Sequence, residues 1–276
     1  MNMQPIESGF AQMGARLKIR EIPSVWRRNR VSWFDPRDYS LDIERDRKGE
    51  FFELRVPTHL SATLGLVVLH SEPKQRHLLL LVRKTADKPQ TDRFLCGHDE
   101  REWFVAAVPG RPSSVRQAMD ALQPEAVRAA LVHEQVSLEK RYRRKNRAFR
   151  RQGEWFFVPE PSLVVNDKLV FHNEPIRRGR GKPHLVEQLI RSGGETVYVC
   201  RQRPNGLTEQ EYRALLQESR EAAQWGWRVM TRNANVYARG KVRHSDHETI
   251  DLLFWHRVLM NTETQSRTMA NVEFLD

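Results

Sequence analysis

Residues 51–57 read FFELRVP, residues 64–70 read LGLVVLH, and residues 77–83 read HLLLLVR. Each run is short and rich in Val, Leu and Phe, and Pro, Ser or charged residues separate the runs. This pattern is typical of β-strands joined by exposed turns. Residues 103–108, WFVAAV, form a fourth strand candidate. The first part of the chain is therefore predicted to be rich in β-structure.

After residue 112, the sequence pattern changes from one typical of strands to one typical of helices. Ser113 or Ser114 can cap a helix whose apolar residues recur at helical spacing. A second helix is predicted to begin near Pro124 and to continue to about Arg151, becoming strongly basic in its last turns. Further along, residues 208–211 (TEQE) form a capping box, which predicts another helix.

The remaining C-terminal sequence returns to short strand candidates punctuated by Pro, Asn and Asp. No alternation of strand and helix supports a doubly wound sheet. We therefore predict an α+β fold of mixed short-stranded sheets with a central basic helical segment and two subdomains. The expected parts are a β-rich N-terminal α+β part (residues 1–112), a helical basic connector (113–152) and a C-terminal α+β part (153–276).

The overall composition favours a protein of the cytoplasm. The chain has 276 residues, a hydrophobic content of 39%, and only two cysteines, Cys96 and Cys200. A lone distant pair of cysteines does not make a disulfide framework, so a reducing compartment is expected. The sequence starts without the apolar core of a signal peptide, and its apolar runs are too short to span a bilayer. We expect no membrane insertion.

The positive charge is concentrated in two blocks. Residues 140–152, KRYRRKNRAFRRQ, contain eight basic residues and no acid, and residues 177–182, RRGRGK, contain four more. Together they carry +12, whereas the whole chain carries +11. Such focused charge favours a polyanion partner, most simply a nucleic acid, either DNA or RNA. The predicted contacts are Lys140, Arg141, Arg143, Arg144, Lys145, Arg147, Arg150, Arg151, Arg177, Arg178, Arg180 and Lys182.

Each basic block also has a simpler interpretation. Residues 140–152 could be a solvated helix face, and RRGRGK could be a mobile surface loop without a ligand. The glycines of RRGRGK would let backbone amides approach an anion. The spacing of a Walker loop is absent, so we do not infer nucleotide hydrolysis.

The C-terminal half contains possible ligands for a divalent metal. His184 and Glu187 form H-x-x-E, and His244 and His247 form H-x-x-H. Three protein ligands and an open water position suffice for a hydrolytic metal site. No H-E-x-x-H motif or paired C-x-x-C motif is present, and histidines in polar or capping roles are the alternative.

Three further residues are considered as a possible ligand or nucleophile. Cys200 and His256 could lie near the candidate metal ligands. Cys96 precedes Gly97 and His98, but adjacent residues seldom aim a nucleophile and its base at one point, so a buried structural cysteine is expected.

Four segments resemble a family of uncharacterised bacterial proteins. They are residues 94–109 (FLCGHDEREWFVAAVP), 151–161 (RQGEWFFVPEP), 173–187 (NEPIRRGRGKPHLVE) and 242–263 (VRHSDHETIDLLFWHRVLMNTE). The resemblance implies a bacterial, cytoplasmic setting and no particular activity or catalytic residue.

The sequence thus leads to three hypotheses about function. The first is a nucleic-acid-binding protein that contacts the phosphate backbone through the basic helix and the Arg/Gly loop. The second is a metal-dependent nuclease or related hydrolase that uses the histidine set. The third is a non-catalytic subunit whose basic block docks on an acidic protein of a larger complex.

Overall fold

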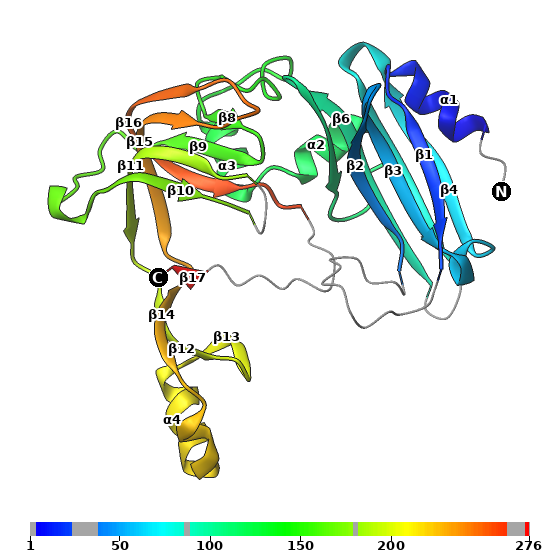
Figure 1. The fold of residues 1–276 in the computed structure, drawn as a ribbon. Coiled ribbons are helices and arrows are strands. Elements are labelled where there is room, and N and C mark those ends of the chain that lie inside the picture. Colours follow the sequence, from blue (N-terminus) through cyan, green and yellow to red (C-terminus); the bar gives the residue numbers. More distant parts are fainter. Residues whose placement is uncertain (1–3, 24–37, 86–88, 179–181, 264–273, 276) are drawn as a thin grey trace. The chain divides into compact units, whose positions relative to one another are not determined.

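The computed structural model describes residues 4–23, 38–85, 89–178, 182–263 and 274–275 (Figure 1). Their helices and small sheets form an α+β fold, as predicted. The chain divides into two compact units, Met1–Arg128 with Asn261–Ser266 and Ala129–Met260 with Arg267–Asp276. The boundary falls within residues 113–152. Among the described residues, no helix is both long enough and apolar enough to cross a membrane.

The described part of the first unit contains two sheets, the helices α1 and α2 and two short 3-10 helices (Thr58–Leu60 and Pro73–Gln75), and α3 begins near its end. One sheet has the strand order β1-β3-β2, with β1 parallel to β3, and the other is antiparallel with the order β4-β5-β6-β7. The bounds are α1 (Gln4–Gln12), β1 (Leu17–Ile22), β2 (Ser40–Asp46), β3 (Gly49–Pro57), β4 (Leu64–Glu72), β5 (His77–Lys84), β6 (Gln90–Asp99), β7 (Glu102–Ala107) and α2 (Val115–Ala121). The four apolar runs predicted as strands lie in β3, β4, β5 and β7.

Large buried side chains join α1 to the sheets of the first unit. Phe10 of α1 and Phe52 of β3 are both fully buried, and their rings meet edge to face with centroids 4.9 Å apart. The rings of Trp103 of β7 and Phe52 also meet edge to face, with centroids 5.6 Å apart. Ser114 caps α2, because its side chain accepts a hydrogen bond from the Gln117 amide at 3.2 Å, as the sequence predicted.

The second unit is built on a six-stranded antiparallel sheet with the order β10-β11-β15-β16-β9-β8. A smaller sheet has the order β13-β12-β14-β17, and α4 contacts it through β12 and β13 (Figure 1). The bounds are β8 (Arg150–Gln152), β9 (Trp155–Pro159), β10 (Phe171–Ile176), β11 (His184–Ser192), β12 (Glu195–Cys200), β13 (Arg203–Thr208), α4 (Glu209–Glu218), β14 (Arg228–Arg232), β15 (Asn235–Arg243), β16 (Ile250–Met260) and β17 (Phe274–Leu275). The predicted capping box of Thr208 and Glu211 opens α4.

The prediction of a basic helix that continues to about Arg151 is wrong. Helix α3 (Glu125–His133) ends much earlier, because Gln135 adopts a left-handed conformation with φ of +50°. The amide of Val136 then donates to the carbonyl of Leu131 at 3.0 Å, which closes the helix end. The chain continues through turns until β8, so the basic side chains lie on turns and a strand.

The packing around Phe52 leads to a first prediction. Replacement of Phe52 by Ala removes a fully buried ring that contacts two aromatic neighbours, and should lower the free energy of unfolding by about 3–5 kcal/mol. Denaturation by urea, followed through tryptophan fluorescence, measures the loss. Phe254→Ala is the control, because that ring is 40% exposed and should cost far less. Equal costs would contradict this account of the core.

Candidate functional site

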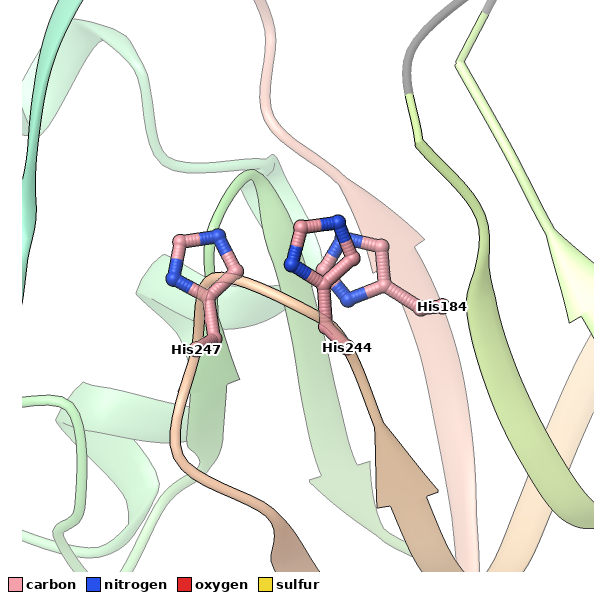
Figure 2. Close-up of side chains that lie close together, drawn as sticks. All are labelled: His184, His244 and His247. Atoms are coloured by element: carbon pink, nitrogen blue, oxygen red, sulfur yellow. The ribbon is translucent and has the colours of Figure 1, made fainter.

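Three predicted metal ligands meet in the second unit. His184 is the first residue of β11, and His244 and His247 lie in the segment that links β15 to β16. Figure 2 shows the three side chains converging from these two segments. Each offers one ligand nitrogen, and these atoms all lie within 4.8 Å of one another. The ring centroids are 4.2 Å apart for His184 and His244 and 4.6 Å apart for His244 and His247. We call these residues the histidine triad.

A buried glutamine holds the triad together. Gln152 of β8 is fully buried, and its amide nitrogen donates to the carbonyls of Val242 at 3.2 Å and Glu248 at 2.7 Å. Its amide oxygen lies 2.9 Å from Nδ1 of His184. Gln152 thus contacts residues on both sides of His244 and His247 in the sequence, and also the third histidine.

A polar network surrounds His244. Its Nδ1 accepts a hydrogen bond from the backbone amide of Asp246 at 3.1 Å and lies 3.9 Å from the Asp246 carboxylate. That carboxylate also binds Nζ of Lys182 at 2.6 Å. Lys182 closes the RRGRGK loop, so this ion pair connects the basic loop to the triad.

The turn between β8 and β9 forms one wall of the site. Gly153 has φ of +57°, and a Cβ added there would lie 2.9 Å from Nε2 of His247 and 3.4 Å from Cε1 of His184. Glu154 places Oε2 3.8 Å from Nε2 of His184. The turn therefore brings its backbone against two of the rings and a carboxylate toward one of them.

The site favours a neutral imidazole at His244 and ionised carboxylates around it. Burial, followed by the charges of His184 and His247, lowers the pKa of His244 below its ordinary value. Burial alone would raise the pKa of Glu154 and that of Asp246. For Glu154, this effect of burial is outweighed by hydrogen bonding and by the charges of His184 and Arg178, so its pKa is lowered. For Asp246, it is outweighed chiefly by the hydrogen bond and charge of Lys182, so its pKa is also lowered. A cation at the triad would meet anionic oxygen nearby.

Three other residues considered from the sequence lie outside the triad. Glu187 accepts a hydrogen bond from the Lys241 amide at 2.8 Å, and its carboxylate packs on Gly240 of β15. His256 is buried, and its Nδ1 donates to the carbonyl of Phe254 at 2.7 Å. Cys200 is a buried free thiol of β12. None of them joins the group of possible ligands found among the described residues.

Cys96 is also buried and free, in β6 of the first unit, as the sequence analysis expected. Burial raises the pKa of its thiol well above the ordinary value. The neighbouring His98 packs edge to face on Trp103, with ring centroids 4.9 Å apart. A protonated, inaccessible thiol is a poor nucleophile.

The first basic block forms an ordered turn. Asn146 organises it, because its side-chain oxygen accepts from the amides of Ala148 at 2.9 Å and Phe149 at 3.0 Å. Phe149 is buried and meets Phe156 of β9 edge to face at 5.1 Å. We call residues 140–147 the basic turn. Its exposed basic side chains are Lys140, Arg143, Lys145 and Arg147, whereas Arg141 and Arg144 are half-buried.

The exposed side chains of the basic turn have no acidic partner within the described residues. Two hydrogen bonds of Arg151 connect the basic turn to the turn between β8 and β9. The amide of Arg151 donates to the carbonyl of Arg144 at 2.7 Å, and the Arg151 guanidinium donates to the carbonyl of Gly153 at 3.0 Å. Arg150 is half-buried on β8. The turn and the histidine triad therefore belong to one local structure.

The second basic block is described only in part. Arg177 is exposed, and Arg178 is half-buried and close enough to Glu154 to affect its pKa. Lys182 is exposed, and it binds Asp246. Arg180 lies outside the described residues. Arg151 of the first block and Arg178 of the second thus both lie near the turn between β8 and β9.

Sequence reasoning missed Gln152, Glu154 and Asp246 as site residues. Gln152 and Glu154 lie just after Arg151, near which the sequence predicted the end of the basic helix. Asp246 lies inside the H-x-x-H motif, and this position is the one available signal. No motif marks a buried glutamine as the partner of a histidine distant in sequence.

No family model, curated protein or solved structure matches the chain. A function must therefore be inferred from the residues of the site itself.

The contact of Gly153 with the triad leads to a second prediction. Gly153→Ala should displace the rings of His184 and His247, because the new Cβ would meet both. The left-handed backbone should also cost about 1 kcal/mol of stability. Gly226→Ala is the matched control, with φ of +68° and no atom within 4 Å of the added Cβ. Nitrogen-15 spectra of the histidine rings should change only in the first variant. Unchanged rings in Gly153→Ala would contradict the packing.

Proposed function

We propose that the protein binds nucleic acid, with its second unit contacting mainly the phosphate backbone. The observation that carries the proposal is the basic turn, an ordered segment whose four exposed basic side chains, Lys140, Arg143, Lys145 and Arg147, form no ion pair with an acidic residue among the described residues. A solvated surface normally intersperses both signs of charge. Four cations held close together on one turn repel each other, and a polyanion relieves that repulsion.

The distribution of charge supports the same proposal. Residues 129–260 contain 24 Lys and Arg against 15 Asp and Glu, so this part of the chain carries +9 of the total +11. Arg151, which connects the basic turn to Gly153, and Arg178, which lies near Glu154, bring charge from both basic blocks to the turn between β8 and β9. A field of this kind increases the rate at which a polyanion is captured.

The contacts should be largely independent of base sequence. The first block lies on turns and a short strand rather than on a helix that could enter a major groove. Arginine and lysine on such a surface bind phosphate oxygens, which carry no sequence information. We therefore expect similar affinity for unrelated sequences at the same salt concentration.

Charge removal tests the proposal. Lys140, Arg143, Lys145 and Arg147 are replaced together by Gln, which should change stability by no more than about 0.5 kcal/mol per site. The affinity for fluorescent oligonucleotides of unrelated sequence, measured by anisotropy over a series of salt concentrations, should fall. The slope of log affinity against log salt should become less steep by about 0.7–0.9 for each phosphate that the variant no longer binds.

A matched variant controls for net charge alone. Arg47, Lys48, Lys74 and Arg101 are exposed basic residues of the first unit, and their replacement by Gln removes the same charge. This variant should retain the salt slope of the original protein. An unchanged slope in the basic-turn variant would refute the proposal. Binding to polyglutamate but not to oligonucleotides would favour an acidic protein as the partner.

A second candidate function is a metal-dependent nuclease or related hydrolase. The observation that favours it is the histidine triad next to Arg178 and Lys182, since hydrolysis of a phosphodiester needs an activated water and cations around the phosphate. Water would add to phosphorus as the bond to the leaving oxygen breaks, giving a phosphomonoester and an alcohol.

The hydrolase candidate makes its own prediction. Cleavage of a fluorogenic phosphodiester should require added Zn²⁺ or Mn²⁺, stop with a chelator, and fall by about 100-fold or more in His184→Ala. His172→Ala is the control, because His172 is exposed on β10 and lies outside the triad. Cleavage that persists in His184→Ala would exclude the triad as its source.

A further inference from the structure

We propose that the histidine triad binds one divalent transition-metal ion of the zinc class, and that Gln152 fixes His184 in the tautomer that binds it. The proposal stands on the geometry of the triad and holds whether or not the protein binds nucleic acid. Within the described residues, no other group of His, Cys, Asp or Glu brings three ligand atoms so close together.

The first step is the tautomer of His184. Two carbonyl oxygens accept hydrogen bonds from the Gln152 amide nitrogen, so that end of the amide must be NH₂ and the other end must be oxygen. The amide oxygen of Gln152 faces Nδ1 of His184. Because this oxygen can only accept a hydrogen bond, Nδ1 must carry a proton and donate it. The neutral ring therefore carries its proton on Nδ1 and a lone pair on Nε2. Ligating histidines are held in this way by an acceptor at the second ring nitrogen.

The second step concerns His244. Its Nδ1 now accepts from the Asp246 amide, which places the proton of the neutral ring on Nε2. Binding through Nε2 requires the opposite tautomer, with a proton on Nδ1. The Asp246 carboxylate is 3.9 Å from Nδ1 and can accept that proton's hydrogen bond after a small shift of the linking segment. Asp246 would then support His244 as Gln152 supports His184.

The third step is the fit of an ion. Tetrahedral coordination with bonds of about 2.1 Å separates neighbouring ligand atoms by about 3.4 Å. The triad nitrogens lie within 4.8 Å, so metal binding requires them to close by up to about 1.4 Å. The rings are also nearly parallel, with angles of 19–25° between their planes. They must turn so that their in-plane lone pairs converge.

The ligand set selects the kind of ion. Three imidazoles suit Zn²⁺, Co²⁺, Ni²⁺ and Cu²⁺, whereas Mg²⁺ and Ca²⁺ prefer oxygen ligands. Glu154, with Oε2 3.8 Å from Nε2 of His184, lies beside the remaining coordination position. That position can take the carboxylate or a water molecule that the carboxylate contacts. Either choice gives the four ligands that zinc prefers.

The test is metal binding by the 276-residue protein. After treatment with a chelator, it should bind one equivalent of Zn²⁺ in competition with a chromophoric chelator, give the visible absorption of tetrahedral Co²⁺, and ignore Mg²⁺. His184→Ala, His244→Ala and His247→Ala should each weaken Zn²⁺ binding by more than about 100-fold, and His172→Ala should not. No binding by the original protein, or equal binding by all the variants, would overturn the proposal.

The role of Gln152 has separate readouts. Gln152→Leu removes the acceptor for His184 and should weaken Zn²⁺ binding by about 10–100-fold, and Gln152→Glu restores an acceptor and should recover part of the loss. Because either variant could fail to fold, the nitrogen-15 spectrum of His184 in the unaltered, metal-free protein provides a second measurement. At a pH at which the ring is neutral, it should show Nδ1 protonated and Nε2 unprotonated. The opposite tautomer would overturn this role.

Discussion

The amide of Gln152 is the interaction on which the candidate site depends. It is fully buried in β8, and its three hydrogen bonds reach His184 at the start of β11, Val242 near the end of β15 and Glu248 shortly before β16. A buried amide left without these partners would cost about 1–3 kcal/mol for each unpaired group. The hydrogen bonds that satisfy the Gln152 amide therefore also hold His184 next to the segment that carries His244 and His247.

The register of the antiparallel sheet also places two of the histidines next to one another. His184 starts β11, and Arg243, the last residue of β15, pairs with Leu185, the next residue of β11. The register of one strand pair thus brings His184 and His244 together, although 60 positions separate them in the sequence. Glycine at position 153 completes the arrangement, because a side chain there would occupy the space of the rings.

This dependence on register explains what the sequence could and could not predict. Local signals were reliable where one residue and its near neighbours decide the structure, as at the caps Ser114 and Thr208. The end of α3 was missed because Gln135 adopts a left-handed conformation usually taken by glycine. Three of the four proposed metal ligands converge, yet spacing alone could not separate them from Glu187, whose carboxylate instead caps the backbone of β15. Gln152 has no local signature, because its role exists only once three distant segments have met.

Arg178 and Lys182 of the second basic block lie close to carboxylates of the candidate site. Lys182 binds the Asp246 carboxylate, and Arg178 lies near enough to Glu154 for its charge to lower the pKa of that carboxyl group. A divalent ion bound by the triad would attract the same carboxylates and would weaken their hold on Arg178 and Lys182. These side chains would then be more available to a phosphate, and the ion itself would add positive charge to the surface. Because coupling between two binding events is reciprocal, a bound polyanion should in turn increase the affinity of the triad for metal. The two proposals are independent in their tests, but the ion pair of Lys182 with Asp246 and the charge of Arg178 near Glu154 provide a physical route by which one event would favour the other.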